Sequence, residues 1–167
     1  TNGKVELSST SESAITSLNV GVAGGGVAVN VVGFGNVITN TVESVVEGNS
    51  VIHAGGLVDV SAENTSTINA LGIGVAGGPV AVGVMAAGNL IISTVDARID
   101  SSEVTSGTTL DVTATSASNI LSLSGGVSAG GVGVSVSFSG NSITGFTNAE
   151  VTSGSVLDAG GAMTIES

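Results

Sequence analysis

The fold is decided by AGGPVAVGVMAAGNLI, residues 76–91, because close copies of this stretch recur along the chain. It matches AGGGVAVNVVGFGNVI at residues 23–38 and AGGVGVSVSFSGNSI at residues 129–143. In each copy, three valines follow the glycine pair at every second position. This alternation is typical of a β-strand that begins at a turn. The chain is therefore an array of strand-forming repeats.

Matching positions in these copies define the period of the array. The isoleucines Ile15, Ile68 and Ile120 are 53 and then 52 residues apart. The same spacing relates three more sets of residues, which are Val27, Val80 and Val132, then Asn36, Asn89 and Asn141, and finally Val51, Val104 and Val156. We therefore expect one solenoid segment over residues 1–167 that is part of a longer array. Its repeats span about 15–67, 68–119 and 120–167, and residues 1–14 end a preceding repeat.

Alternation also predicts which side chains face the interior of the sheet. Three sets of apolar residues in each copy alternate with small or polar residues, as expected for a half-buried sheet. In the first two copies these inward sets are Val27, Val29, Val31 and Val80, Val82, Val84; Ile38, Val42, Val46 and Ile91, Val95, Ile99; Val58, Val60, Ala62 and Leu110, Val112, Ala114.

The tripeptide Ala-Gly-Gly recurs at 23–25, 54–56, 76–78, 129–131 and 159–161, each time before an apolar alternation. Glycine allows positive φ and close backbone approach, so these tripeptides are expected at corners. Gaps of 31 and 22 residues in the first copy predict two unequal rungs per repeat. The fold class is therefore all-β, a parallel β-helix (β-solenoid) built from 52–53-residue repeats of about two rungs each. Six rungs would make a rod about 30 Å long.

The one-residue slip between the two periods is expected at a corner, because repeat folds tolerate insertions in turns. The Ala54-Gly55-Gly56 corner of the first copy is matched by the shorter Ser106-Gly107 region of the second.

Three asparagines, Asn36, Asn89 and Asn141, each follow a glycine at the same position of the repeat. We expect an inward-facing corner ladder, in which each amide bonds the backbone of the turn and the neighbouring asparagine. A ligand-binding role for these amides is the alternative. Nothing else in the copies converges on that role, so the three residues are the predicted structural ladder.

Composition excludes several functional classes. The chain has 2 basic and 13 acidic side chains and a formal net charge of −11, whereas a nucleic-acid binder needs clustered Lys or Arg. The absence of Cys excludes disulfides and Cys-based zinc sites. Residues 71–92 form an uncharged stretch long enough to span a bilayer as a helix, but their alternation by two argues against a membrane-spanning segment.

Acidic residues recur at matching positions. Glu6, Asp59 and Asp111 share one column, and Glu43 and Asp96 share another. Paired carboxylates could serve glycoside hydrolysis or hold Ca²⁺, but residues two rungs apart would be about 10 Å from one another. A solvated acidic face is the simpler interpretation, although opposed rungs could bring Glu47, Asp100 or Glu103 together.

The single histidine, His53, lies next to the Ala54-Gly55-Gly56 corner, and its counterparts are Ser106 and Asp158. We interpret it as an exposed turn residue, because a catalytic base needs a nearby partner. The sequence thus indicates no catalytic residue, no metal ligand and no cofactor, and no motif supports a Ca²⁺ site.

The order of Ala-Gly-Gly, Val-x-Val, Gly-Asn-x-Ile and a second strand resembles the β-strand repeats of very large bacterial exoproteins. These are the filamentous-haemagglutinin-like adhesins and the leukotoxin-type surface proteins. The resemblance implies a parallel, right-handed β-helix that is secreted or held at the bacterial cell surface as a stalk or adhesive filament, and it implies no catalytic residues.

The expected function is therefore a non-enzymatic structural and adhesive segment of an extracellular fibre. Its expected partners are a host-surface or matrix ligand, or further copies that stack end to end on the uncapped strands. One alternative is an ice- or crystal-surface-binding solenoid, suggested by Thr39, Thr41, Thr113 and Thr115. A solenoid enzyme that acts on glycans is a third, lower alternative.

Overall fold

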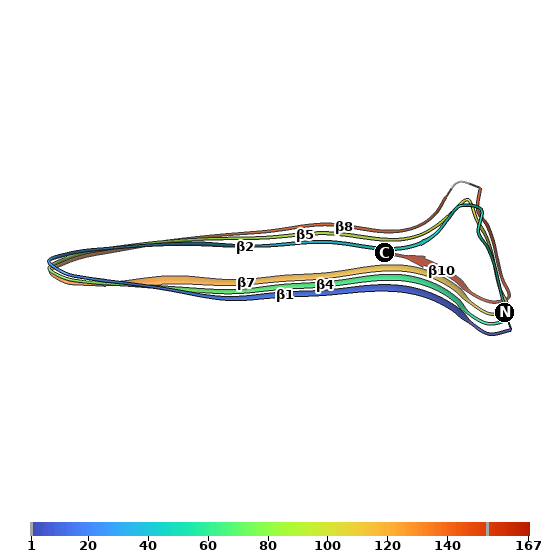
Figure 1. The fold of residues 1–167 in the computed structure, drawn as a ribbon, viewed down its shortest axis with the longest axis horizontal. Helices are drawn as coiled ribbons and strands as arrows, with labels where there is room; N and C mark the ends of the chain where they lie inside the picture. The colour runs from blue at the N-terminus through green and yellow to red at the C-terminus, as the bar shows by residue number, and fades with distance from the viewer. Residues whose placement is uncertain (1, 153) are drawn as a thin grey trace.

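The structure is a computed structural model that describes residues 2–152 and 154–167, and the described residues form strands and turns without a helix. Each repeat contributes two long strands and one short strand (Figure 1). The first repeat forms β1 (Val5–Gly24), β2 (Val27–Val46) and β3 (Val51–Ala54); the second forms β4 (Val58–Gly77), β5 (Val80–Asp100) and β6 (Glu103–Ser106); the third forms β7 (Leu110–Ala129), β8 (Val132–Thr152) and β9 (Val156–Ala159), and β10 (Met163–Glu166) follows.

Equivalent strands of successive repeats pair in parallel and make three sheets. Sheet A has the order β1-β4-β7-β10, sheet B has β2-β5-β8, and sheet C has β3-β6-β9. Ile15 pairs with Ile68 and Ile68 with Ile120, and the sets that begin at Val27 and Asn36 also pair as expected. The fourth set is wrong, because Val51 pairs with Glu103 instead of Val104, and Glu103 pairs with Val156. The parallel β-helix predicted from the repeats is confirmed.

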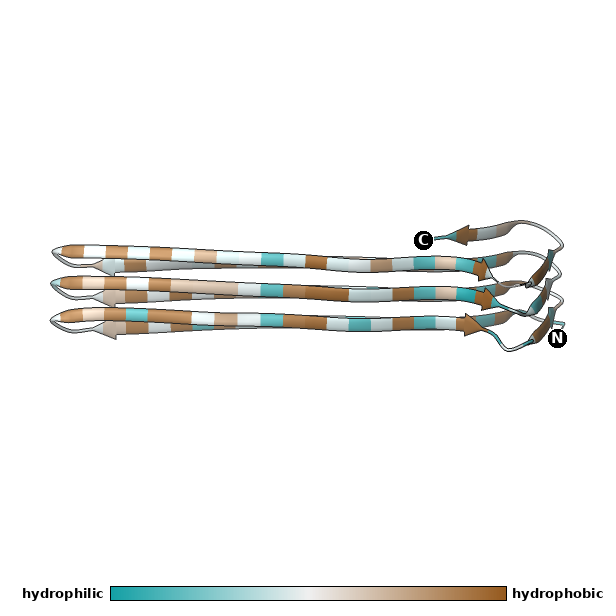
Figure 2. Cartoon of the chain, turned by 90° about the horizontal axis from the view of Figure 1, so that it is seen from above, coloured by the Kyte–Doolittle hydropathy of each residue, from teal (hydrophilic) through white to brown (hydrophobic). Residues whose placement is uncertain are grey.

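One repeat makes one rung, and the expectation of two rungs per repeat is wrong. Register offsets of 53 and 52 residues, from Val5 to Val58 and from Val58 to Leu110, place whole repeats directly above one another (Figure 2). A long strand of 20 residues extends about 66 Å, whereas adjacent rungs are only about 4.8 Å apart. The described part of the chain is therefore a thin blade about 66 Å wide.

The two long strands of each rung run in opposite directions, far apart at one end and close together at the other (Figure 1). We call residues 16–37, 69–90 and 121–142 the arm, and the other described residues the base. The base encloses Val, Ile and Leu side chains, whereas the innermost cluster near the arm's tip contains Ala28, Ala76 and Ala81. Because large side chains hold the sheets apart and alanines let them approach, the size of the inward residues sets the wedge shape.

The valines that follow each tip Ala-Gly-Gly tripeptide point outward, so their predicted inward orientation is wrong. Val27 is 70% exposed while Ala28 is 2% exposed, and Val29 and Val31 are also exposed. A continuous strand cannot change its alternation, and Ile38, which the sequence correctly placed inside, lies an odd number of residues from Val27 in the same strand β2. The same holds for Val80 and the matching valines of β5 and β8.

The other two inward sets are confirmed, because their members line the core of the base and its junction with the arm. These buried residues are Ile38, Val42 and Val46; Ile91, Val95 and Ile99; Val58, Val60 and Ala62; Leu110, Val112 and Ala114.

Three of the Ala-Gly-Gly tripeptides lie at the arm's tip, and the other two lie in the turns before β4 and β10, which lead from one rung to the next. At the tip, a methyl group on Gly78 would overlap the carbonyl oxygen of Gly25, and one on Gly130 would overlap that of Gly78. Glycine is thus needed where tip turns stack.

The slip lies elsewhere than expected. The offset changes from 53 at the Val46–Ile99 pair to 52 at the Val51–Glu103 pair, so the extra residue lies in the turn between β2 and β3. There Gly48 and Asn49 have positive φ angles of 74° and 59°.

Candidate functional site

The three predicted ladder residues are joined by hydrogen bonds along the stack. Asn36 Nδ2 donates to Asn89 Oδ1 at 2.8 Å, and Asn89 Nδ2 donates to Asn141 Oδ1 at 2.8 Å. Asn36 Nδ2 also donates across the blade to Ser17 Oγ at 3.1 Å. The residues lie within the long strands β2, β5 and β8, so the expected corner position is wrong. The central residue, Asn89, uses both its amide oxygen and its amide nitrogen in the stack and is 4% exposed.

A second polar cluster, at the boundary of arm and base, was not predicted. Asn40 Nδ2 lies within hydrogen-bond distance of Asn64 Oδ1 at 2.9 Å, Ser13 Oγ at 3.0 Å and Ser66 Oγ at 3.1 Å. Asn64 and Ser66 are fully buried. The signal was present in the sequence, because Asn40 lies midway between Ile38 and Val42 and must share their inward face.

Within each of these two clusters, the polar side chains form hydrogen bonds with one another. The hydrogen bonds run between side chains on facing strands or between adjacent rungs, so their role is to fix the register of the stack.

The acidic residues predicted to align in columns do pair in the sheets, but members of a column are closer together than expected. Glu6 pairs with Asp59 and Asp59 with Asp111 in adjacent rungs, about 4.8 Å apart rather than two rungs apart. Like charges at this spacing repel. The charge is partly compensated, because Lys4 Nζ lies 2.6 Å from Glu6 Oε1 and Ser61 Oγ donates to Asp59 Oδ2 at 3.2 Å.

The second acidic column surrounds Arg98. Arg98 Nη1 lies 3.1 Å from Asp96 Oδ2, and Arg98 Nη2 lies 3.5 Å from Glu47 Oε2. Desolvation acts to lower the pKa of the Arg98 guanidinium, but the carboxylates of Asp96, Glu47 and Glu43 outweigh it, so the pKa lies above its usual value. Asn148 Nδ2 also donates to Asp96 Oδ1 at 3.2 Å. Asp96 is thus held by structural partners on both oxygens.

The other acidic residues considered for a joint site have separate positions. Arg98 contacts Glu47, Asp100 Oδ1 accepts a hydrogen bond from Thr152 Oγ1, and Glu103 pairs in β6 with Val51 and Val156. Among residues 2–152 and 154–167, no group of three or more His, Cys, Asp or Glu could hold a metal ion.

His53 lies in the short strand β3 and not in a turn. It is exposed and pairs with Thr105, which pairs in turn with Asp158. The expected counterpart Ser106 is wrong by one residue, because the slip precedes β3. The exposed position of His53 agrees with the expectation.

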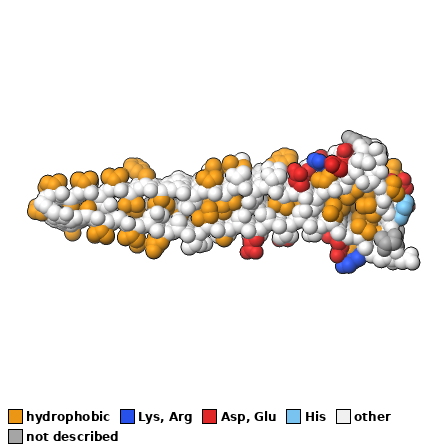
Figure 3. All heavy atoms as spheres, in the orientation of Figure 1, with side chains coloured by type: hydrophobic (Ala, Val, Ile, Leu, Met, Phe, Trp, Pro, Cys, Tyr) orange, Lys and Arg blue, Asp and Glu red, His pale blue; other side chains and the backbone are white. Residues whose placement is uncertain are grey.

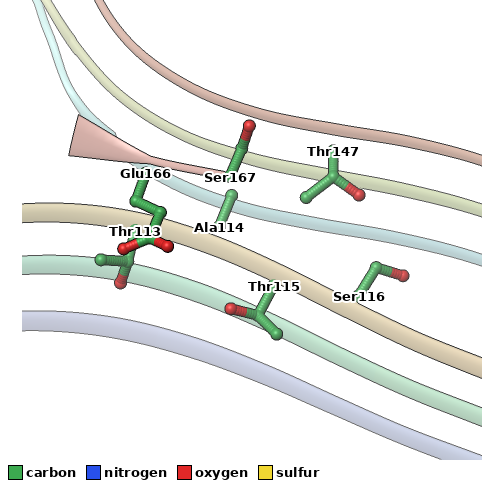
Figure 4. Close-up of a pocket in the computed structure, with 7 residues that line it drawn as sticks. All are labelled: Thr113, Ala114, Thr115, Ser116, Thr147, Glu166 and Ser167. Carbon is green, nitrogen blue, oxygen red and sulfur yellow. The ribbon is translucent and has the colours of Figure 1, made fainter.

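A cavity of about 560 Å³ opens beside β7 where its pairing with β10 ends at Thr113 and Glu166 (Figure 4). Its lining residues are Thr113, Ala114, Thr115, Ser116, Thr147, Glu166 and Ser167. The lining offers hydroxyl groups and one carboxylate, and none of its residues is a His, Lys or Arg.

The threonine ranks that an ice-binding surface would need are interrupted. Thr39 pairs with Ile92, and Thr94 of the neighbouring column pairs with Phe146. Each of these columns thus contains a large apolar side chain.

The outer surface of the arm is apolar and uncharged, whereas all the charged side chains lie in the base (Figure 3). On sheet A the outward side chains align in columns such as Leu18, Leu71 and Leu123, and Val22, Val75 and Val127. We call the exposed apolar residues of this face the A-face patch; they are Leu18, Val20, Val22, Leu71, Ile73, Val75, Leu121, Leu123 and Val127, at 37–76% exposure.

The exposed apolar residues of sheet B in the arm form the B-face patch, which comprises Val27, Val29, Val31, Val37, Val80, Val132, Val134, Val136 and Phe138. Glycines 33, 35, 88 and 140 interrupt the outward face of sheet B farther from the tip. Among the residues that the structure describes, there is no helix long and apolar enough to cross a membrane.

The acidic columns and the two apolar patches therefore form a repeating surface, and the asparagine ladder lies in the interior that supports it. Comparison of the chain with protein-family models, with curated protein sequences and with solved structures gave no match.

Proposed function

We propose that this chain is a non-enzymatic structural and adhesive segment of a bacterial secreted or cell-surface fibrous protein. The observation that carries the proposal is the register of the repeats, in which equivalent residues such as Asp59 and Asp111 are paired neighbours in adjacent rungs. Each outward position is thereby displayed again about every 4.8 Å along the stack. Such a surface suits a ligand that is itself repetitive, such as a matrix fibre or a polysaccharide.

Binding on this surface would depend on many weak contacts. Exposed polar side chains gain little free energy individually, but contacts that are linked by a rigid scaffold bind together and raise the overall affinity. The hydrogen-bonded asparagine ladder supports this function, because it keeps the rungs in register and so keeps the outward columns straight.

The acidic columns of the base are the proposed contact surface. The net charge of −11 favours cationic regions of a host-surface or matrix ligand, and attraction of this kind weakens with added salt. The resemblance to filamentous-haemagglutinin-like and leukotoxin-type repeats supports the same assignment and an extracellular location.

The test is binding of the chain to an array of matrix proteins and glycans, with two controls. A rung-scrambled chain tests whether the stacked surface is needed, and the triple variant Glu6→Gln/Asp59→Asn/Asp111→Asn removes one acidic column while keeping its shape. We expect saturable binding that is lost in the scrambled chain and is weakened in the triple variant. A folded wild-type chain that binds nothing saturably would refute the adhesive function.

A further inference from the structure

We infer that the A-face patch is a self-association surface, on which the arms of two copies pack face to face with their bases pointing in opposite directions. This interface is separate from the proposed ligand-binding surface of the base. It brings together two identical patches, as in an isologous dimer.

The first argument is the nature of the arm's surface. The outward positions of Leu71, Ile73 and Val75 carry larger side chains than the inward positions between them, which are Gly72 and Gly74. In the base the order is reversed, since Val58 and Val60 face inward while Asp59 faces outward. Large apolar side chains are normally the ones that pack against another layer, so the outward face of the arm is the face suited to such packing.

The second argument is area. On sheet A the arm consists of residues 16–24, 69–77 and 121–129, so it is about 30 Å long, and three rungs about 4.8 Å apart give it an area of about 430 Å². This lies within the range of the largest apolar patch on a monomeric protein, which is about 300–600 Å². Two such faces bury about 860 Å² in total, which is the size of a weak, transient interface. We therefore expect reversible association that depends on concentration.

The third argument is charge, and it fixes the direction of packing. All charged side chains of the chain lie in the base, and they sum to −11. Copies packed in the same direction would bring two acidic bases together. Copies packed in opposite directions separate the bases by about the length of the arm, which exceeds the Debye length of about 8 Å at physiological salt.

The geometry of the patch agrees with this direction. An apolar groove of about 350 Å³ lies where the arm joins the base, and Leu18, Leu71, Leu121 and Leu123 line it. In the opposed arrangement, the tip residues Val22, Val75 and Val127 of one copy face this groove in the other.

A lipid bilayer is the competing occupant of the A-face patch, and flotation with vesicles distinguishes it from a second copy.

The test begins with sedimentation velocity of the whole chain over a range of concentrations. The double variant Leu71→Ser/Ile73→Ser disrupts the A-face patch, and Val82→Ser/Val84→Ser is its matched control on sheet B. Both pairs lie on central strands and point outward. We expect the A-face variant to weaken dimerisation at least tenfold and the sheet B variant to leave it unchanged, with the same far-UV circular dichroism for both. A dimer that survives the A-face variant overturns the inference.

Cross-linking then tests direction, and the natural absence of Cys allows single cysteines to be introduced cleanly. Val75→Cys lies near the tip and Asn69→Cys near the base end of the same outward row of β4, about 20 Å apart. With a short bismaleimide we expect cross-links in a mixture of the two variants and few in either alone. Efficient cross-linking of each variant to itself would show the same-direction arrangement and refute the charge argument. Flotation with phosphatidylcholine vesicles that is abolished by Leu71→Ser/Ile73→Ser would assign the patch to lipid and overturn the inference.

Discussion

A carboxylate placed at two adjacent positions of β5 should report directly which face of the arm is inside. Ala81 is 0% exposed and belongs to the tip cluster with Ala28 and Ala76, whereas Val82 points outward between Val29 and Val134. The Ala81→Asp side chain would be buried in an arm without a countercharge and in a space sized for a methyl group. We expect it to lower the free energy of unfolding by about 4 kcal/mol or more, because an unpaired buried charge costs several kcal/mol.

The Val82→Asp change should be much milder. It removes contacts with two β-branched cross-strand neighbours, each worth about 0.2–1 kcal/mol, while its carboxylate remains in contact with water. We therefore expect a loss of about 1–2 kcal/mol. The difference between the two variants is large compared with a total stability of about 5–15 kcal/mol.

The assay is urea unfolding followed by far-UV circular dichroism, since the chain has no Trp or Tyr to provide a fluorescence signal. Protein concentration is kept low so that self-association does not contribute. The carboxyl group introduced by Ala81→Asp would have a raised pKa in the folded state. The cost of its charge should therefore be present at neutral pH, diminish as the pH falls through that raised pKa, and be gone below about pH 4. Loss of the β spectrum in Val82→Asp with a stable Ala81→Asp would refute the orientation of the arm.

Three further pairs of variants test the interior and the turns, each by comparing free energies of unfolding. Asn89→Asp replaces the amide that donates to Asn141 Oδ1 and should cost about 2–4 kcal/mol. Asn141→Asp keeps that acceptor oxygen at an exposed position and should cost less than half as much. Equal losses would contradict a buried ladder. Gly78→Ala should cost about 1–3 kcal/mol because its methyl group overlaps the Gly25 carbonyl oxygen, while Gly33→Ala, with open space around it, should be nearly neutral; a neutral Gly78→Ala would show that the tip turns are not tightly stacked. Ser118 Oγ is buried without a hydrogen-bond partner among the described residues, so Ser118→Ala should preserve stability or raise it by up to about 1 kcal/mol. Ser66→Ala removes the hydrogen bonds to Asn40 and Asn64 and should lower stability by about 1–2 kcal/mol. The reverse order would invalidate this account of the polar cluster.

The repeat register and the interior of the base could be predicted from the sequence. A residue such as Val60 alternates with charged or polar neighbours, so only one face of the strand can be buried. Equivalent residues in a solenoid must also pair, which is why the column of Glu6, Asp59 and Asp111 is predicted correctly.

The orientation of the arm could not be predicted in the same way. Around Val82 the alternate positions are Ala81 and Gly83, so the pattern offers two apolar faces and favours the larger residue for the interior. The narrow gap between the sheets reverses that choice, because the inward positions nearest the tip are alanines, and farther in the larger Phe34 and Met85 lie over Gly72 of the facing sheet. Recognition that Val27 and Ile38 belong to one uninterrupted strand would have resolved the ambiguity.

The number of rungs was also hidden in the sequence. Ala-Gly-Gly at residues 23–25 marks the tip turn of a rung, whereas Ala-Gly-Gly at residues 54–56 marks the turn that leads to the next rung, and glycine composition alone does not distinguish them. The candidate site could be only partly predicted for a similar reason. Asn36 is recognisable because its column repeats in all three copies, whereas Asn40 is followed in its column by Ser93 and Gly145 and so leaves no repeated signal.

One rung per repeat makes the chain very inefficient at covering distance. Each repeat of 53 residues advances the stack by about 4.8 Å, or about 0.09 Å per residue, compared with about 1.5 Å per residue in an α-helix. A stalk about 100 Å tall would need about 20 such repeats, or more than about 1,000 residues. What each added repeat provides in quantity is sheet surface, since it widens two broad faces of about 66 Å by one strand. A protein that lengthens in this way becomes a broad sheet instead of a long rod, and other molecules would contact it mainly on its two broad faces.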